Sequence, residues 1–292
     1  MSSPHRATLF AEDAEVLTHA AHPGEQYVLR VHAPLVAAAA HPGCFAHIRC
    51  DERLEMRRPL SIMRADAEDG WVEFLYKRVG IGTGLLSEKR EGDRLSVLGP
   101  IGVPFDLRED KPRALLIGGG VGIPPMVYLA DRLRDAADCF QPFVIMGSEV
   151  PFPFTARPSQ IIVRGMPEGA IGCMPLMEDW GIASRLASLQ GYPGCFEGYV
   201  TDLARVWLEA MDEHERTQVC IYACGPTPML AATAQLAQSF DLPSQVCLEE
   251  YMACAVGGCA GCAVPIRTAS GPAMKRVCVD GPVFDGDTVV WP

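Results

Sequence analysis

Four cysteines near the C-terminus constrain this chain more than any other feature. Cys254, Cys259, Cys262 and Cys278 follow the pattern C-x4-C-x2-C-x15-C, and the first three match the spacing of plant-type [2Fe–2S] ligands. A zinc site usually has two pairs of close ligands, whereas the last cysteine here stands alone. The spacing predicts an iron–sulfur cluster, and zinc binding or simple packing remain alternatives. Three glycines between the ligands would let backbone N–H groups reach the sulfurs: Gly257, Gly258 and Gly261.

Length and charge narrow the class of protein. The chain has 292 residues and a formal net charge of −11, which favours two or three domains and argues against nucleic-acid binding. No apolar run approaches the ~20 residues of a membrane span. The N-terminal sequence MSSPHRATLFAEDAEV has no secretory-signal layout. We therefore expect a cytoplasmic protein without a membrane span, whose twelve cysteines are reduced.

Residues 1–107 are expected to form a small antiparallel β-barrel. Short apolar runs such as QYVLRVHA, WVEFLYKRV and DRLSVLGPIG end in Gly, Pro or charged residues, which is typical of strands joined by tight turns. A sandwich would show the same pattern. Residues 37–40, AAAA, could form a helical turn or a loop.

The sequence pattern changes after the polar stretch at residues 107–113. A buried strand over 114–117 runs into a glycine turn and an amphipathic helix, and QPFVIMGS and TQVCIYACGPTPM repeat this pattern. Alternating strands and helices predict a doubly wound parallel α/β sheet over residues 112–243, followed by a small C-terminal domain over 244–292. The segment 151–198 is rich in Pro and Gly. We expect a strand over 160–164 and a helix around 179–189 within it.

Two glycine turns follow strands of the α/β domain, GGGVGIPP and YACGPTPM. Ligands bind at the carboxyl ends of strands in such sheets, and a glycine turn leading into a helix suits a pyrophosphate. The two turns predict one dinucleotide site, although ordinary packing could also explain them. The predicted binding residues are Gly118, Gly119, Gly120, Gly122, Gly225 and Pro226, and Cys224 is the candidate catalytic residue beside a nicotinamide.

A third motif lies in the expected barrel. RRPLS contains Arg58, whose planar guanidinium can bind a phosphate. Gly82 and Thr83 in LYKRVGIGTGLLS offer a backbone N–H and a hydroxyl to the same group. A solvated arginine and an ordinary turn are the alternative.

These four motifs, in this order along the chain, resemble the ferredoxin-reductase-like electron-transfer flavoproteins, above all the electron-transfer subunits of class 1B dihydroorotate dehydrogenase. The resemblance implies a barrel that binds FAD, an α/β domain that binds NAD(P) and a C-terminal [2Fe–2S] domain. It also implies the FAD contacts, which are Arg58, Pro59, Leu60, Ser61, Leu75, Tyr76, Lys77, Gly82 and Thr83.

The resemblance further implies a function. The chain would move electrons between NAD(H), FAD, the cluster and a catalytic redox subunit in a heteromer, with a dihydroorotate dehydrogenase of pyrimidine biosynthesis as the first candidate. The alternative partners belong to complexes of the ferredoxin:NADP reductase, sulfide dehydrogenase or hydrogenase type. A zinc-stabilised binding protein and a self-contained reductase are rival classes. The segment 151–198 is longer than the family requires, which bears on the partner rather than on the cofactors.

Overall fold

The computed structural model describes residues 9–292 and begins with a closed antiparallel barrel. Its strands follow the order β1-β2-β5-β4-β3-β6. Alternate side chains such as Leu29, Ile62 and Phe74 fill the interior, because successive residues of a strand point to opposite faces. The predicted barrel is confirmed. The strands are β1 (Phe10–His22), β2 (Gln26–His32), β3 (Phe45–Arg49), β4 (Arg58–Asp66), β5 (Trp71–Lys77) and β6 (Arg94–Ile101).

Two short helices accompany the barrel. The helix α1 (Pro34–Ala39) contains most of the alanine run, so the helical alternative for that run is correct. The helix α2 (Ile81–Ser87) follows β5 closely and contains Gly82 and Thr83 in its first turn.

The second layer is a six-stranded sheet in the order β11-β8-β7-β12-β13-β16. The first five strands are parallel and β16 is antiparallel. The predicted doubly wound parallel sheet is confirmed. The strands are β7 (Arg113–Gly119), β8 (Gln141–Gly147), β11 (Ala183–Ala187), β12 (Val219–Cys224), β13 (Ser244–Cys247) and β16 (Val283–Asp285).

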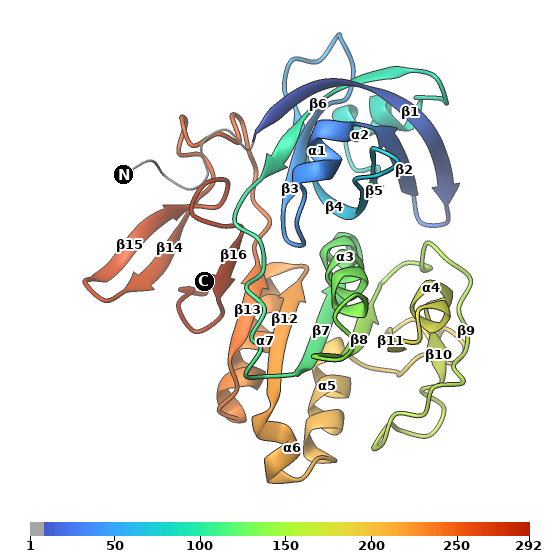
Figure 1. Cartoon of the computed structure of the whole chain (residues 1–292), viewed down its shortest axis with the longest axis vertical. Helices are drawn as coiled ribbons and strands as arrows, with labels where there is room; N and C mark the ends of the chain where they lie inside the picture. Colours follow the sequence, from blue (N-terminus) through green and yellow to red (C-terminus); the bar gives the residue numbers. More distant parts are fainter. Residues whose placement is uncertain (1–8) are drawn as a thin grey trace.

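Helices cover both faces of this sheet (Figure 1). Ala114 and Leu116 of β7 pack in the cluster that contains α3 (Ile123–Arg134). Leu115 and Ile117 pack on the opposite face with α5 (Val200–Glu209) and α7 (Thr227–Ser239). The helix α3 also contacts β4, which brings the barrel over the glycine turn after β7.

The C-terminal segment forms the hairpin β14 (Ala263–Thr268) and β15 (Gly271–Arg276), which extends from the body of the molecule in Figure 1. The division at 107, 112 and 243 stays a prediction. Two strands after residue 243, β13 and β16, pair into the central sheet. The cluster segment is therefore attached at both of its ends to the sheet of the α/β domain.

The segment 151–198 differs from expectation. Residues 160–164 form no strand, and only the short pair β9 (Arg157–Pro158) and β10 (Gly172–Cys173) lies nearby. Residues 180–189 are not helical: α4 (Pro175–Asp179) ends at the start of the expected helix, just before Gly181 adopts a φ of +73°. The chain then forms the edge strand β11. The short helix α6 (Glu213–Thr217) precedes β12. No helix within residues 9–292 is long and apolar enough to cross a membrane.

Candidate functional site

The two predicted glycine turns meet at one edge of the sheet. Gly118 and Cys224 are register partners at the carboxyl ends of β7 and β12. A Cβ added to Gly122 would overlap the Cys224–Gly225 peptide, and one added to Gly119 would lie 2.5 Å from Met229 Sδ. Glycine is therefore required for the two turns to touch.

The remaining members of the predicted dinucleotide set lie at this edge as well. Gly120 has a φ of +55° with open space around its Cα. Pro226 is the N-cap residue of α7, and the short 3-10 turn Gly120–Gly122 leads directly into α3. Two helix N-termini and a backbone without Cβ atoms converge here, which suits the pyrophosphate of a dinucleotide.

Cys224 is fully buried at the end of β12. Its Sγ lies 3.9 Å from Glu249 Oε1. The neighbouring thiol of Cys247, burial and the Glu249 carboxylate all raise the pKa of Cys224. The thiol is therefore neutral at pH 7, so Cys224 is unsuited to act as a thiolate nucleophile.

Glu249 was not among the residues predicted from the sequence. Its side chain reaches solvent, but the protein atoms around its carboxyl raise its pKa by desolvation, and the contact with Cys224 partly opposes this. Register could have revealed it, because Cys247 pairs with Cys224 across β12 and β13 and Glu249 follows two residues later. The structure therefore adds a carboxyl group to the sheet edge.

The predicted FAD contacts on β4 and β5 lie on two different faces of the barrel wall. Leu60 and Tyr76 lie in the barrel core, where Tyr76 OH is 2.9 Å from His19 Nε2. Pro59 and Ser61 are half-buried and alternate with Leu60 along β4. Leu75 packs with α3 residues outside the barrel. The structure thus gathers Pro59, Ser61 and Leu75 on the outer face and separates Leu60 and Tyr76 from them. Lys77 is half-buried at the end of β5.

Arg58 lies against the first turn of α2. A Cβ on Gly82 would be 2.7 Å from Arg58 Nε, so glycine permits this contact. Thr83 Oγ1 accepts a hydrogen bond from Val79 N at 3.0 Å, which shapes the turn. Arg58 Nη1 donates to the carbonyls of Met56 and Arg57, and no carboxylate within residues 9–292 pairs with it. A guanidinium beside a helix N-terminus favours an anion, which fits a flavin pyrophosphate.

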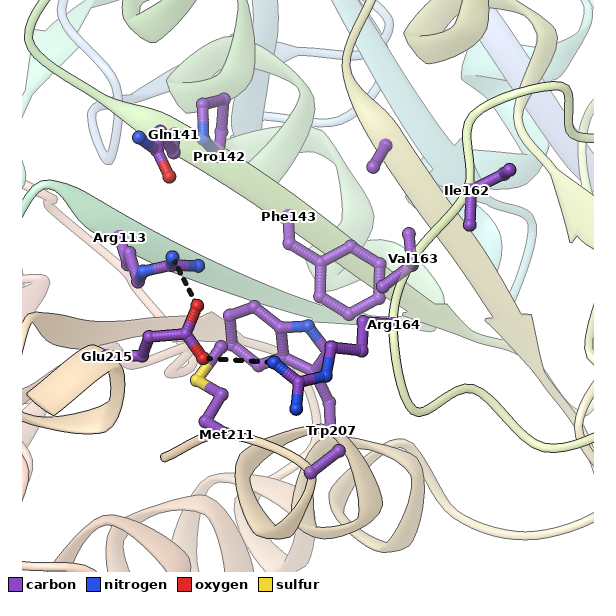
Figure 2. A pocket seen from close by; sticks show the side chains of 12 residues that line it. Arg113, Gln141, Pro142, Phe143, Ile162, Val163, Arg164, Trp207, Met211 and Glu215 are labelled. Carbon is purple, nitrogen blue, oxygen red and sulfur yellow. Dashed lines mark hydrogen bonds and ion pairs between the residues drawn. The ribbon is translucent and has the colours of Figure 1, made fainter. Parts of the chain in front are cut away.

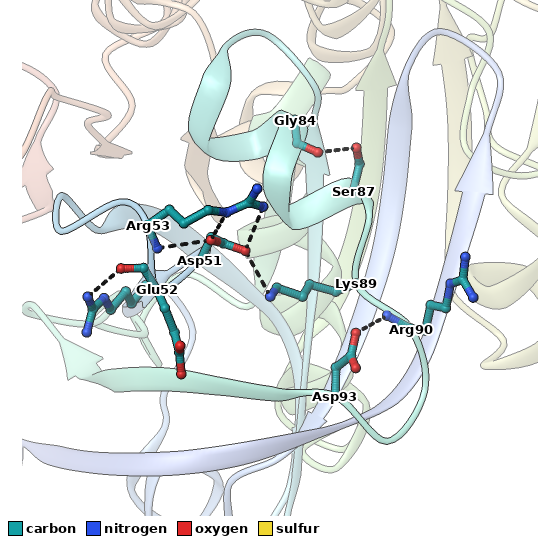
Figure 3. Close-up of polar contacts among 9 residues, drawn as sticks. Asp51, Glu52, Arg53, Gly84, Ser87, Lys89, Arg90 and Asp93 are labelled. Carbon is teal, nitrogen blue, oxygen red and sulfur yellow. Dashed lines mark hydrogen bonds and ion pairs between the residues drawn. The ribbon is translucent and has the colours of Figure 1, made fainter.

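An ion-pair network holds this region together (Figure 3). Asp51 accepts a hydrogen bond from Arg53 Nε at 2.7 Å and lies 3.2 Å from Lys89 Nζ. The bond from Arg53 is the main reason why the pKa of Asp51 is held far below its usual range. Asp51 precedes the RRPLS motif and Lys89 follows α2. The network therefore links the two segments that carry Arg58 and Gly82.

The four C-terminal cysteines form two pairs. Cys262 Sγ and Cys278 Sγ are 3.4 Å apart and buried, and Cys259 N donates to Cys254 Sγ at 3.4 Å. No three His, Cys, Asp or Glu side chains of the described chain are gathered around the position of one ion. A [2Fe–2S] cluster has four cysteine ligands on two irons, and two thiol pairs fit that requirement.

The backbone around these cysteines also suits a cluster. Burial raises the pKa of Cys254, but the N–H groups of Val256, Cys259 and Gly258 more than offset this and lower it to about 7. Burial and the neighbouring Cys262 raise the pKa of Cys278 to about 12. Thiolates crowded in this way are stabilised by a bound cation, since metal ligands must be deprotonated.

The three glycines in the cluster loop contribute in different ways. Gly257 has a φ of +80°, which disfavours other residues. Gly261 N donates to Cys259 Sγ at 3.4 Å, and a Cβ on Gly261 would lie 3.5 Å from that sulfur. A Cβ on Gly258 would meet nothing, so the space there does not require glycine. Its backbone N–H is among the groups that lower the pKa of Cys254, in agreement with the expectation that this N–H reaches a sulfur.

Residues 249–290 match the model of the iron-sulfur cluster binding domain of dihydroorotate dehydrogenase B. Solved structures share the fold. A NADH-dependent reduced ferredoxin-NADP oxidoreductase is 28% identical, with a TM-score of 0.77 over 96% of this chain and 90% of that chain. A ferredoxin NADP+ reductase from Neisseria gonorrhoeae, with bound FAD and NADP, is 14% identical, with a TM-score of 0.57 over 80% and 92% of the two chains.

Relatives that align with the whole chain belong to the same enzyme as the matched cluster domain. The electron transfer subunit of dihydroorotate dehydrogenase B (NAD+) from Geobacillus sp. strain WCH70 is 34% identical over 90% of this chain and 92% of its own length. The subunit of the same name from Desulforamulus reducens is 33% identical over 96% and 98% of the two chains. The chain therefore belongs to the family of the electron transfer subunits of dihydroorotate dehydrogenase B (NAD+).

Proposed function

We propose that this chain carries electrons between NAD(H) and a dihydroorotate dehydrogenase catalytic subunit, using its own FAD and [2Fe–2S] cluster. One observation carries the proposal. Cys247 is the register partner of Cys224 at the dinucleotide edge, and the cluster ligand Cys254 follows only seven residues later. That length spans at most ~25 Å. The dinucleotide edge and the cluster loop are therefore neighbours along one short segment.

Each donor set has a task in this proposal. The interlocked turns, with Gly119, Gly122 and Gly225, would hold the NAD(H) pyrophosphate. Arg58 and the first turn of α2 would hold the FAD pyrophosphate, while Pro59 and Ser61 would line the flavin on the outer barrel face. Bound FAD exchanges two electrons with NAD(H) and single electrons with an iron–sulfur cluster.

The residues near the nicotinamide position would orient rather than react. Cys224 is buried and neutral, so we assign it a supporting role beneath the nicotinamide position. Glu249, whose Oε1 lies 3.9 Å from Cys224 Sγ, is a carboxyl group able to hold a proton at this edge. Because its pKa is raised, Glu249 holds a proton more readily than an ordinary glutamate does.

The partner, location and assembly are parts of the same proposal. The relatives are named as subunits of dihydroorotate dehydrogenase B, which supports a heteromer with its catalytic subunit. All twelve cysteines within the described residues are free thiols, which supports the cytoplasm, since its thiols are kept reduced.

A second function is favoured by one comparison. The reduced ferredoxin-NADP oxidoreductase matches almost the whole chain with a TM-score of 0.77. In that alternative the chain would serve a ferredoxin-linked catalytic subunit. Affinity purification from the native cell distinguishes the two, because the first proposal predicts recovery of a dihydroorotate dehydrogenase.

The cofactor content is tested by optical and EPR spectra of the chain purified without oxygen. We expect a flavin absorbance that NADH bleaches, and an EPR signal of a reduced [2Fe–2S] cluster that appears in the same titration. A colourless preparation that contains zinc and no flavin would rule the proposal out.

A further inference from the structure

One buried side chain on the outer face of the barrel has no polar partner. His47 lies in β3 and is 1% exposed, and neither of its ring nitrogens has a hydrogen-bond partner within residues 9–292. Its neighbours Ala46 and Ile48 fill the barrel core, so the His47 side chain points out of the barrel. Buried polar groups in folded proteins nearly always have a partner. The two unpaired nitrogens of His47 are therefore unusual.

The other side chains of the described chain with an unpaired buried polar atom differ from His47, because each of them also forms an ion pair or a hydrogen bond. Figure 2 shows one case, in which Arg113 has an unpaired Nε while its Nη2 lies 3.1 Å from Glu215 Oε1. Arg185 also has an unpaired Nε, while its Nη2 donates to Ile161 O at 2.7 Å. The remaining three are Arg49, Arg64 and Asp131. Among these side chains, His47 alone has no partner at any polar atom.

One neighbour of the imidazole is the strand that would line the flavin. His47 and Pro59 are register partners in β3 and β4, and residues directly opposite each other share one face of a sheet. The Arg57 guanidinium, just before β4, donates to His47 O at 3.1 Å and to Ser96 Oγ at 2.8 Å. The backbone of β3 is therefore tied to the start of the flavin strand at this position.

The other neighbour is the segment that carries the cluster ligands. Met252 precedes the ligand Cys254 by two residues. Its side chain packs in the same hydrophobic cluster as Phe45 of β3 and the ligand Cys262. Phe45 and His47 alternate with core residues along β3, so both lie on the outer face. The segment with the cluster ligands is therefore packed on the barrel face that bears His47.

Backbone carbonyls from both neighbours approach the ring. Burial, followed by the charge of Arg57, lowers the pKa of His47, whereas the backbone groups of Met252 and Arg57 oppose this shift. A backbone group that favours a protonated imidazole is a hydrogen-bond acceptor, hence a carbonyl. Neither contact reaches full hydrogen-bond geometry. A neutral imidazole has a single N–H donor, so a small shift of the ring completes a hydrogen bond to one of the two segments.

We propose that His47 is a positioning residue that fixes the segment with the cluster ligands against the strand that lines the flavin. The inference rests on the proposed function, which assigns FAD to the outer face of β4 and the [2Fe–2S] cluster to the four cysteines. An apolar side chain of similar size would fill the same space without holding either carbonyl. Electrons would then pass from FAD to the cluster more slowly, because the separation of the two cofactors would no longer be fixed.

The first test follows electrons through the FAD- and cluster-loaded chain after it is mixed with NADH without oxygen. Stopped-flow absorbance gives the rate of flavin reduction, and rapid-freeze EPR gives the rate of cluster reduction. In His47→Phe we expect an unchanged rate of flavin reduction and an about tenfold slower reduction of the cluster, since small misplacements of reacting groups have effects of this size. His47→Gln keeps an N–H donor and should restore most of the rate. His32→Phe, at an exposed histidine of β2, is the matched control and should behave as the wild type.

The second readout needs no turnover. Hydrogen exchange of the amides in residues 249–256 of the resting, loaded chain reports local opening of this segment. We expect faster exchange in His47→Phe and the wild-type rate in His47→Gln. If phenylalanine prevents folding, His47→Met takes its place, because a methionine side chain adapts to irregular space.

Two results would overturn the role of His47. The first is a rate of cluster reduction and of amide exchange in the apolar variant equal to that of the wild type. The second is a His47→Gln variant that restores neither rate, because ring packing alone would then explain the effect. A wild-type chain whose cluster is not reduced by NADH would instead contradict the proposed function itself, on which the inference rests.

Discussion

At the scale of single residues, Cys259 gives the sharpest test of the cluster. It is an exposed cysteine whose Sγ accepts a hydrogen bond from Gly261 N. We expect Cys259→Ser to abolish the cluster absorbance and its EPR signal, because a serine hydroxyl replaces a thiolate ligand. The flavin should stay bound, since its proposed contacts lie in the barrel. Loss of both cofactors together would contradict separate sites.

His47 gives a prediction about pH. Its side chain is buried on β3, and both ring nitrogens lack hydrogen-bond partners within residues 9–292. Burial, followed by the charge of Arg57, lowers its pKa from 6.5 to about 4. The unfolded chain therefore takes up this proton at a higher pH than the folded chain. Stability from this residue is complete above pH 6.5 and falls as the pH drops towards 4.

Protonation of His47 lowers the free energy of unfolding by about 3 kcal/mol at most. Urea unfolding of the wild type and of His47→Phe, measured between pH 7 and pH 4, checks it. We expect the wild type to lose more unfolding free energy than the variant over this range. Parallel curves for the two proteins would show that His47 titrates normally in the folded chain.

Residue chemistry was partly predictable from the sequence. The thiol spacing, the glycine turns and Arg58 all came from local motifs. The separation of Tyr76 from Leu75 did not, because a motif names neighbouring residues, whereas a strand turns them to opposite faces. Glu249 escaped notice because it approaches Cys224 only through the pairing of β12 and β13.

At the scale of elements, α2 provides a matched pair of glycines. A Cβ on Gly82 would lie 2.7 Å from Arg58 Nε, whereas a Cβ on Gly84 meets nothing within 4 Å. We expect Gly82→Ala to displace the guanidinium and weaken FAD binding about tenfold or more, the usual cost of losing a hydrogen bond to a charged group. Flavin fluorescence on dilution measures the affinity.

Gly84→Ala is the control for this prediction. Alanine is favoured over glycine in a helix by ~1 kcal/mol, so this variant should keep its flavin and unfold at a slightly higher temperature. Equal flavin affinities in the two variants would contradict the placement of Arg58 at a flavin phosphate.

The strand β11 shows why one element was predicted wrongly. Ser184 and Arg185 are polar, yet both are buried. Ser184 Oγ accepts from Met174 N, and Arg185 Nη2 donates to Ile161 O at 2.7 Å. These contacts with distant residues let two consecutive polar side chains be buried in an edge strand. The sequence therefore lacks the alternation of apolar and polar residues that would indicate a strand. In place of the expected helix around residues 179–189, the chain forms the strand β11 (Ala183–Ala187).

At the scale of the whole molecule, the order of barrel, α/β sheet and cluster segment could be predicted because each carries its own motif. The way in which the last segment attaches could not. The strands β13 and β16 are short and lie on either side of the cluster loop and its hairpin, so their pairing within one sheet depends on contacts far apart in the chain. This pairing holds the cluster loop near the dinucleotide edge.

The most direct measurement is the reduction of NAD+ by dihydroorotate, followed as NADH absorbance without oxygen. It compares the dihydroorotate dehydrogenase catalytic subunit of the same organism alone, this chain alone and the two combined. We expect NADH to form only with the combined proteins, and the rate to collapse when Cys259→Ser replaces the wild type. NADH formation by the catalytic subunit alone, or an undiminished rate with the variant, would contradict electron transfer through this chain.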